Sequence, residues 1–192
     1  MRNDLVNLDA LIVRADFEEV RSDPEPSADG LPNSLRLRDL VSRATSAALR
    51  KPDFQRVTAC WRYTRVAEFV WSFLEGDLLP AAILWRSPTT GSIFVVDGCH
   101  RLSALIAWVL DDYGDNEASL AFFQDLTQPE YLEAAQKTRE LINRVAGSYE
   151  MLQSAAKHPE DSDPVLVARA RNAETLAIPV LWMARKTGTA RR

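Results

Sequence analysis

The sequence contains very little cysteine and histidine, with 2 of each among its 192 residues. Two cysteines are too few for a disulfide framework, and the histidines and cysteines do not stand at the spacings of a metal site. We therefore expect Cys60 and Cys99 to be reduced thiols, and we expect no metal-ligating set in the chain.

Long apolar runs are also absent. No stretch approaches the roughly 20 consecutive apolar residues of a membrane span. The first residues, MRNDLVNLDALIV, carry acids among their apolar positions, which is unlike a signal peptide. These features predict a cytoplasmic protein without a membrane partner.

Neither repeats nor low-complexity segments are visible, and the net charge of −4 argues against a broad electrostatic attraction to nucleic acid. With 46% hydrophobic and 26% charged residues, the composition is that of an ordinary globular protein. The length predicts one domain, or one domain with a small appendage.

Apolar periodicity predicts a mixed set of elements. Strands are expected at AAILW and SIFVVDG, which the turn SPTTG would join as a hairpin or a near-neighbour strand pair. A last strand is expected at LAIPVLWMA, where Pro179 suggests an edge position or the beginning of the strand. Helical spacing is expected from Leu35 to a break at Pro52, at Val66 to Leu74 with Gly76 as terminator, at RLSALIAWVLDDYG, at Pro129 to Ala146, at YEMLQSAA and at PVLVARARNAETLA.

The elements together predict an α+β protein with a small mixed sheet, packed helices and a helical C-terminal extension. Residues 1–34 form an N-terminal segment ending in the proline-rich, exposed loop Ser22 to Ser34. Residues 35–125 form the core, and residues 126–192 form a helical extension with a final strand and a basic tail.

The strand-to-helix junction VVDGCHRLSAL carries the candidate site. A helix start presents free backbone N–H groups and the positive end of the helix dipole, which together suit an anion. Gly98 would let a ligand approach the backbone, and Arg101 could hold phosphate oxygens in a bidentate pair. Asp97 could cap the helix or approach a metal that a phosphate ligand holds.

Cys99 and His100 on the same turn each allow two interpretations. A helix start with nearby cations lowers the pKa of a thiol, so Cys99 could be a reactive thiolate, although cysteine is as readily a small buried filler. A histidine alone is more often a capping or core residue than a catalyst. The clustering of both residues on one turn is what indicates a site.

Three motifs stand in order along the chain: PDFQRVTACW, FVWSFLEGDLLPAAIL and DGCHRLSAL. In this order they resemble the ParB/sulfiredoxin-like superfamily, in which a strand, a G-x-x-R turn and a helix bind nucleotide phosphates. Within it, they are most similar to the N-terminal domain family of GmrSD-type, modification-dependent (type IV) restriction systems. The resemblance identifies residues 35–125 as a ParB/sulfiredoxin-like core, with Trp61 as the motif tryptophan in a loop.

The resemblance implies that the protein binds a nucleoside triphosphate with Mg²⁺, with hydrolysis left open, and serves bacterial defence against phage DNA. The implied phosphate-binding residues are Gln55, Arg56, Gly98, Cys99 and Arg101. The implied catalytic residues are Asp97, His100 and Arg101.

Two departures from the family pattern stand out. Cys99 and His100 replace two glutamines of the family motif, and the chain ends in ARKTGTARR, where relatives continue toward an HNH nuclease. We therefore expect a protein truncated relative to typical members, with DNA or a separate nuclease subunit as candidate partners.

Two alternatives to this function remain open. GCHR with an upstream LPAAILW also resembles sulfiredoxin, an ATP-dependent reductase, in which Cys99 would be the nucleophile and Arg101 the phosphate ligand. The other alternative is a non-enzymatic, DNA-binding or regulatory remnant. Its DNA contacts would come from a basic span that could equally be a solvated helix face, namely Arg36, Arg38, Arg43, Arg50, Lys51, Arg56, Arg62 and Arg65.

Overall fold

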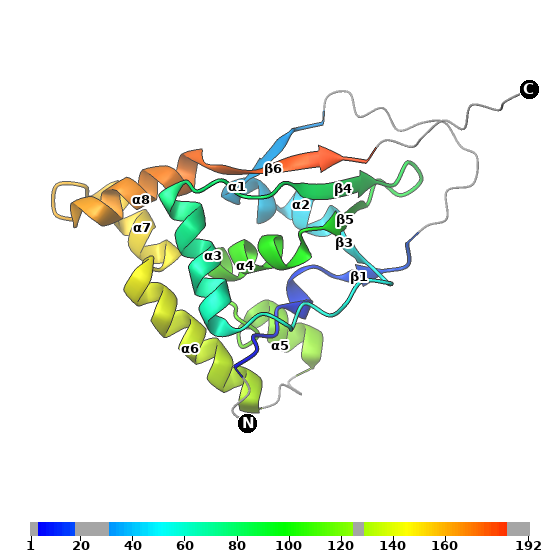
Figure 1. Ribbon diagram of the computed structural model, residues 1–192, viewed down its shortest axis with the longest axis horizontal. Helices are drawn as coiled ribbons and strands as arrows, with labels where there is room; N and C mark the ends of the chain where they lie inside the picture. The colour runs from blue at the N-terminus through cyan, green and yellow to red at the C-terminus, as the bar shows by residue number, and fades with distance from the viewer. Residues whose placement is uncertain (1–3, 18–30, 125–128, 184–192) are drawn as a thin grey trace, which may run out of the picture.

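The computed structural model describes residues 4–17, 31–124 and 129–183. A six-stranded sheet in the order β1-β3-β5-β4-β6-β2 forms one side of the molecule (Figure 1). Parallel and antiparallel pairs both occur, so the predicted mixed sheet in an α+β chain is confirmed. The strands are β1 (Arg14–Ala15), β2 (Ser34–Arg36), β3 (Leu49–Pro52), β4 (Ala82–Arg86), β5 (Ile93–Asp97) and β6 (Ala177–Trp182).

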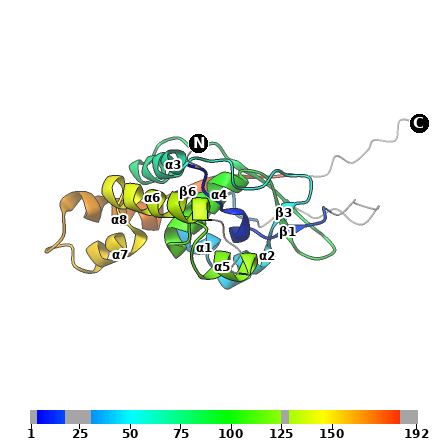
Figure 2. The same cartoon turned by 90° about the horizontal axis from the view of Figure 1, so that it is seen from below.

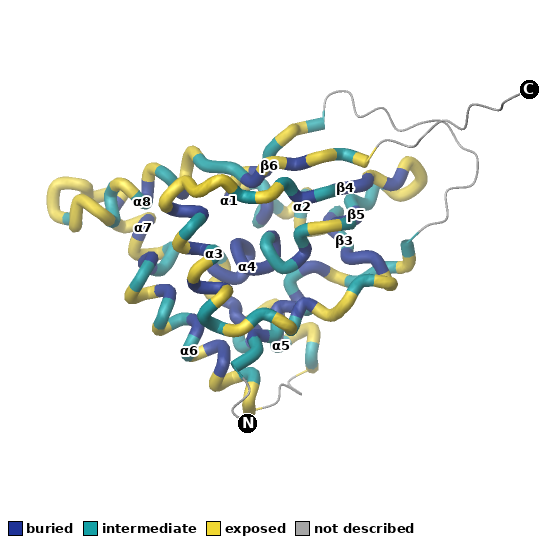
Figure 3. Tube along the Cα trace, viewed as in Figure 1, coloured by how far each residue is buried: buried dark blue, intermediate teal, exposed yellow. Residues whose placement is uncertain are grey.

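Helix α4 is the buried centre of the helical part. It packs against α1, α3, α7 and β4, and Figure 2 shows α1 and α3 on opposite sides of it. Most of α4 is buried (Figure 3). Its buried side chains include Leu102, Leu105 and Trp108. The helices are α1 (Leu37–Leu40), α2 (Arg43–Ala48), α3 (Tyr63–Glu75), α4 (Cys99–Leu110), α5 (Glu117–Phe123), α6 (Pro129–Val145), α7 (Tyr149–Lys157) and α8 (Pro164–Thr175), with a short 3-10 turn, η1 (Asp9–Leu11).

The predicted hairpin and the helix that precedes it are both confirmed. β4 and β5 pair antiparallel, with Leu84 opposite Val95. Helix α3 buries Val66, Val70 and Phe73, and it ends at Gly76, which takes the left-handed conformation (φ 79°) that glycine adopts most easily. These elements follow from local signals, namely β-branched runs around a turn and an apolar stripe that stops at a glycine.

The prediction of one helix from Leu35 to Pro52 is wrong. This stretch forms β2, α1, α2 and β3 in turn, and Pro52 ends a strand. Ser42 starts α2 by accepting a hydrogen bond from the Thr45 N–H, which separates α2 from α1. Leu49 and Lys51 are buried where β3 pairs parallel with β5 and β1 respectively, so tertiary pairing overrides the helical spacing.

Of the two positions that Pro179 suggested for the last strand, the structure excludes the edge of the sheet. β6 pairs parallel with β4 and antiparallel with β2, so it is an inner strand of the sheet. The Val180 N–H donates to Asn33 O on the β2 side, which places the nitrogen of Pro179 on the β4 side. Pairing with β4 begins only at Val180, so Pro179 stands where that ladder begins and removes no hydrogen bond from it.

Residues 4–17 contribute to the same core. Val6, Leu8 and Ile12 are buried, and β1 pairs parallel with β3. Most of the predicted loop Ser22 to Ser34, and the basic tail after Met183, lie outside the described residues. Among the helices that are described, none combines the length and the apolar character needed to cross a membrane.

A buried charged cluster joins this N-terminal segment to the body. Lys51 is fully buried, and its ammonium donates to the carboxylate of Asp9 and to Thr58 Oγ1, the latter at 3.1 Å. The Thr58 N–H donates to the same carboxylate at 2.7 Å. Burial opposes the charge of Asp9, but Lys51 and Thr58 outweigh it, and the pKa of Asp9 is lowered.

We predict that Asp9→Ala destabilises the protein by about 3–5 kcal/mol, because it leaves the ammonium of Lys51 buried without a counter-ion. The measurement is urea unfolding followed by circular dichroism. Asp77→Ala, which removes an exposed carboxylate, is the matched control and should change the free energy of unfolding by less than about 0.5 kcal/mol. An equally small effect for Asp9→Ala would contradict the role given to the cluster.

Candidate functional site

The junction between β5 and α4 depends on Gly98. This residue is the N-cap of α4, and its φ of 100° lies in a region that other residues rarely adopt. A Cβ atom there would lie 3.1 Å from the Cβ of Ala82 and 3.1 Å from Nη2 of Arg101. The predicted approach of a ligand to Gly98 is therefore limited, because Ala82 and Arg101 fill the space beside it.

Asp97 is not the N-cap that the sequence suggested. The cap position belongs to Gly98, and α4 has no side-chain cap. The carboxylate of Asp97, which is 62% exposed, accepts a hydrogen bond of 2.7 Å from the guanidinium of Arg101. Asp97 and Arg101 are thus brought together as an ion pair at the first turn of the helix.

Arg101 is held in place but keeps a free donor. Its guanidinium also donates to Ala81 O at 3.1 Å, and the side chain is only 16% exposed. Its Nε is buried and has no hydrogen-bond partner within the described parts of the chain. A buried donor without a partner is costly, but because this Nε is shielded from solvent it does not by itself offer a bond to a ligand.

Gln55 reaches the end of β5. Its side-chain amide donates to Val95 O at 2.7 Å and to Val96 O at 2.6 Å. The guanidinium of Arg14 donates to Gln55 O at 2.7 Å and to Asp53 O at 2.6 Å, which fixes the turn after β3. Gln55 therefore positions its loop against β5. The side chain of Arg56 is exposed and makes no hydrogen bond or ion pair with any described residue.

Cys99 faces the interior. It is 5% exposed, and its Sγ lies 3.5 Å from Val95 O. Burial raises the pKa of this thiol to about 12, so the thiolate is strongly disfavoured. The geometry favours the interpretation of Cys99 as a buried filler and argues against its use as a nucleophile.

His100 faces a residue that the sequence reasoning did not single out. Its Nε2 lies 2.9 Å from Sγ of Cys60, which is exposed. The imidazole stacks on Trp61 with 5.4 Å between ring centroids and 24° between planes. Burial lowers the pKa of His100, and the nearby cations Lys51 and Arg65 lower it further, so the ring is neutral at neutral pH.

A groove of about 370 Å³ lies beside this cluster. The guanidinium carbon of Arg65 lies 4.9 Å from the ring centroid of Trp61, and Phe69 meets the same ring edge-on at 5.6 Å. The sequence singled out Trp61 as a motif tryptophan in a loop, but it indicated Arg65 only as one member of a basic span. The groove is lined by Trp61, Arg65, Glu68, Phe69, Ser72, Leu79, Pro80 and Arg101.

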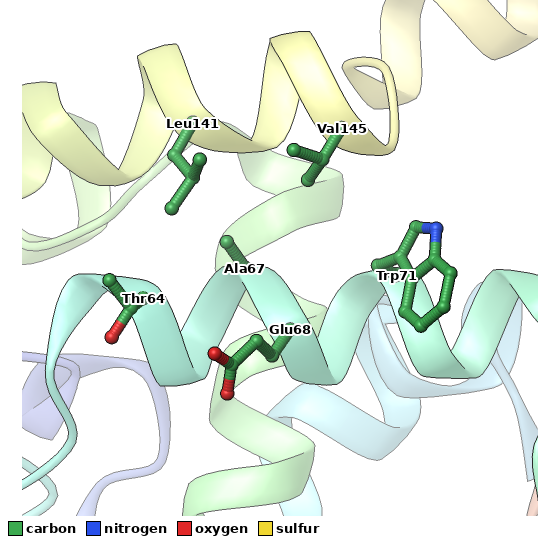
Figure 4. A pocket seen from close by; sticks show the side chains of 6 residues that line it. All are labelled: Thr64, Ala67, Glu68, Trp71, Leu141 and Val145. Atoms are coloured by element: carbon green, nitrogen blue, oxygen red, sulfur yellow. The ribbon is translucent and has the colours of Figure 1, made fainter.

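A second groove, also of about 370 Å³, lies between α3 and α6 (Figure 4). It is mostly apolar, with Leu141 and Val145 of α6 facing Ala67 of α3. None of the site residues expected from the sequence lines it. Glu68 of α3 lines both grooves.

The basic span is divided by the fold. Lys51 lies in the core with Asp9 and cannot contact a ligand. Arg65 alone of this span lines the groove beside Trp61. The exposed members outside the groove are Arg36, Arg38, Arg43, Arg56 and Arg62.

Comparisons with protein-family models, curated proteins and solved structures found no match to this chain. Within the residues that the structure describes, no three histidine, cysteine, aspartate or glutamate side chains are grouped so that they could hold a metal ion.

We predict that Gly98→Ala costs about 1–3 kcal/mol more than Gly91→Ala, which is the usual cost of adding a carbon to a filled space. Both glycines have positive φ, but a Cβ at Gly91 meets nothing within 4 Å, whereas one at Gly98 meets Ala82 and Arg101. Urea unfolding gives the free energy of unfolding of each variant, and the difference between the two values isolates the packing cost. Equal costs would show that the junction has room for a side chain.

Proposed function

We propose that the chain binds a nucleoside triphosphate in the groove between Trp61, Arg65 and Arg101. The observation that carries the proposal is that arginines from α3 and α4 line the same groove as Trp61, with the guanidinium of Arg65 against its ring. Guanidinium groups suit phosphate oxygens, and an aromatic ring suits a base.

Arg101 is the proposed phosphate ligand at the start of α4. Its partly buried guanidinium lines the groove and stands where the positive end of the helix dipole favours an anion. Arg65 is exposed on α3 and would neutralise a second phosphate. Trp61 and Phe69 supply the apolar surface for the base.

Mg²⁺ would enter as part of the nucleotide complex, because such ions are commonly held by phosphates and only one or two carboxylates. Glu68 is the carboxylate of the groove, and Asp97 is the exposed carboxylate next to Arg101. If the nucleotide is hydrolysed, Asp97, which pairs with the groove residue Arg101, is the proposed group that orients the water. His100 lies outside the groove and faces Cys60, so we assign no step of hydrolysis to it.

The wider assignment rests on the same motifs. The strand, the Gly98 turn with Arg101, and helix α4 stand in the order that the ParB/sulfiredoxin-like resemblance implies, and we assign the fold to that superfamily. We extend the proposal to a cytoplasmic role in defence against phage DNA, acting with DNA or a nuclease subunit. The sulfiredoxin-like alternative is less well supported, because the thiol of Cys99 is buried and protonated.

We predict that at least one of ATP, GTP and CTP binds in the presence of Mg²⁺ when titrated calorimetrically. Arg101→Ala and Arg65→Ala should each weaken binding about tenfold or more, because a hydrogen bond to a charged group contributes about 1.5–3 kcal/mol. Arg38→Ala removes an arginine that is 73% exposed and lies outside the groove, and it should leave the affinity unchanged.

Since Arg101 also bonds Asp97 and Ala81, circular dichroism and thermal unfolding must first show that its variant is folded. Unchanged affinity in a folded Arg101→Ala variant would contradict the proposal. So would the absence of binding to all three nucleotides.

A further inference from the structure

The pair formed by Cys60 and His100 is separate from the phosphate-binding groups of the groove. Cys60 lies in the loop before α3, its side chain is exposed, and neither it nor His100 lines the groove. The 2.9 Å between Sγ of Cys60 and Nε2 of His100 places a thiol directly against a ring nitrogen. A nucleophile with a base in hydrogen-bond reach is the arrangement by which proteins activate thiols.

Both members of the pair are held by other elements, so their contact does not depend on a mobile side chain alone. His100 belongs to the first turn of α4, and its ring is stacked on Trp61. The carbonyl of Trp61 accepts a hydrogen bond from the Val6 N–H at 2.9 Å. Thr58, two residues before Cys60, is fixed through its N–H to Asp9.

His100 is present as the neutral ring, which is the form that can accept a proton, although its surroundings disfavour the imidazolium that would result. The charged groups that act on it are Lys51 and Arg65, which disfavour its protonation, and Asp9, which favours it. Burial disfavours the imidazolium most, so the neutral ring has a lone pair on the nitrogen that does not carry its proton. With the proton on Nδ1, Nε2 can accept the proton of the Cys60 thiol.

We propose that Cys60 is a nucleophilic thiol that forms a mixed disulfide with low-molecular-weight disulfides, with His100 accepting its proton. As the S–H proton passes to Nε2 of His100, the Cys60 sulfur bonds to one sulfur of the small disulfide. The S–S bond of that molecule breaks, and its departing thiolate takes the proton from His100. The protein thiol is oxidised to a mixed disulfide while one small thiol is released, and a second thiol reverses the exchange.

This modification would stand next to the groove, because Trp61 follows Cys60 in the chain and lines the groove. The proposal does not depend on nucleotide binding, since the thiol chemistry has its own readout. It assigns the reactive role to Cys60, which the sequence considered only when counting cysteines, and leaves Cys99 in the core.

The test is the rate of thiol release from DTNB, an aromatic disulfide whose released thiolate absorbs visible light, with folded protein at neutral pH. The native chain should show one fast thiol, which reacts at least about tenfold faster than free glutathione. Cys60→Ser should remove the fast phase, and Cys99→Ser should retain it. With glutathione disulfide, mass spectrometry should find the adduct on Cys60.

His100→Asn should slow the fast phase at least about tenfold, because general-base assistance typically contributes a factor of 10² or more. His158→Asn, which alters an exposed histidine in another part of the fold, is the matched control and should leave the rate unchanged. If His100→Asn does not fold, His100→Gln provides the same comparison with a longer side chain. The proposal is overturned if folded His100 variants react at the native rate, if Cys60 reacts no faster than glutathione, or if the fast phase survives in Cys60→Ser.

Discussion

The carboxylate of Asp9 is the point on which the site depends. It receives the buried ammonium of Lys51 from β3 and the N–H of Thr58 from the following loop, and so joins three segments of the chain. An ammonium in the core is stable only with such partners, so the N-terminal segment must pack where it does. Once it is packed, the backbone of Val6 and Leu8 bonds to Trp61 and Thr58.

The two walls of the site follow from that constraint. The loop that Asp9 fixes carries Gln55, whose amide bonds the end of β5, and Trp61, whose ring meets His100. The opposite wall is the first turn of α4, set by the left-handed Gly98 and by the pair of Asp97 and Arg101. The fold thereby directs one cysteine inward and the other outward, and an imidazole lies against the exposed one.

The sequence correctly predicted the elements whose structure depends on neighbouring residues. The β4–β5 hairpin surrounds a short turn, and α3 stops at a glycine, so neighbouring residues contain the necessary information. The strand β3 was missed because its partners, β1 and β5, lie far away in sequence, and nothing in LRKP itself reveals them. The sequence identified the strand-to-helix junction from Asp97 to Arg101. It did not show which side chains of the junction point inward, because that depends on contacts with Ala82 of β4 and Val95 of β5.

The long-range pairs were beyond the sequence for the same reason. Lys51 was counted with a basic surface, although Asp9, 42 residues earlier, draws it into the core. Cys60 and His100 are 40 residues apart, and the ring of Trp61, next to Cys60 in the chain, stacks on His100 in the first turn of α4. The sequence singled out Trp61 because of its place in a motif. That was the one sequence signal for the contact between Trp61 and His100.

The proposed nucleotide site requires that the loop before α3 and the start of α4 form one anion-binding surface. Hydrogen–deuterium exchange with and without saturating ATP, GTP or CTP plus Mg²⁺ tests it most directly. With at least one nucleotide, exchange should slow in peptides covering residues 58–65 and 98–104 and should not change along α7. Protection confined to the groove between α3 and α6, or unchanged exchange with all three nucleotides, would contradict it.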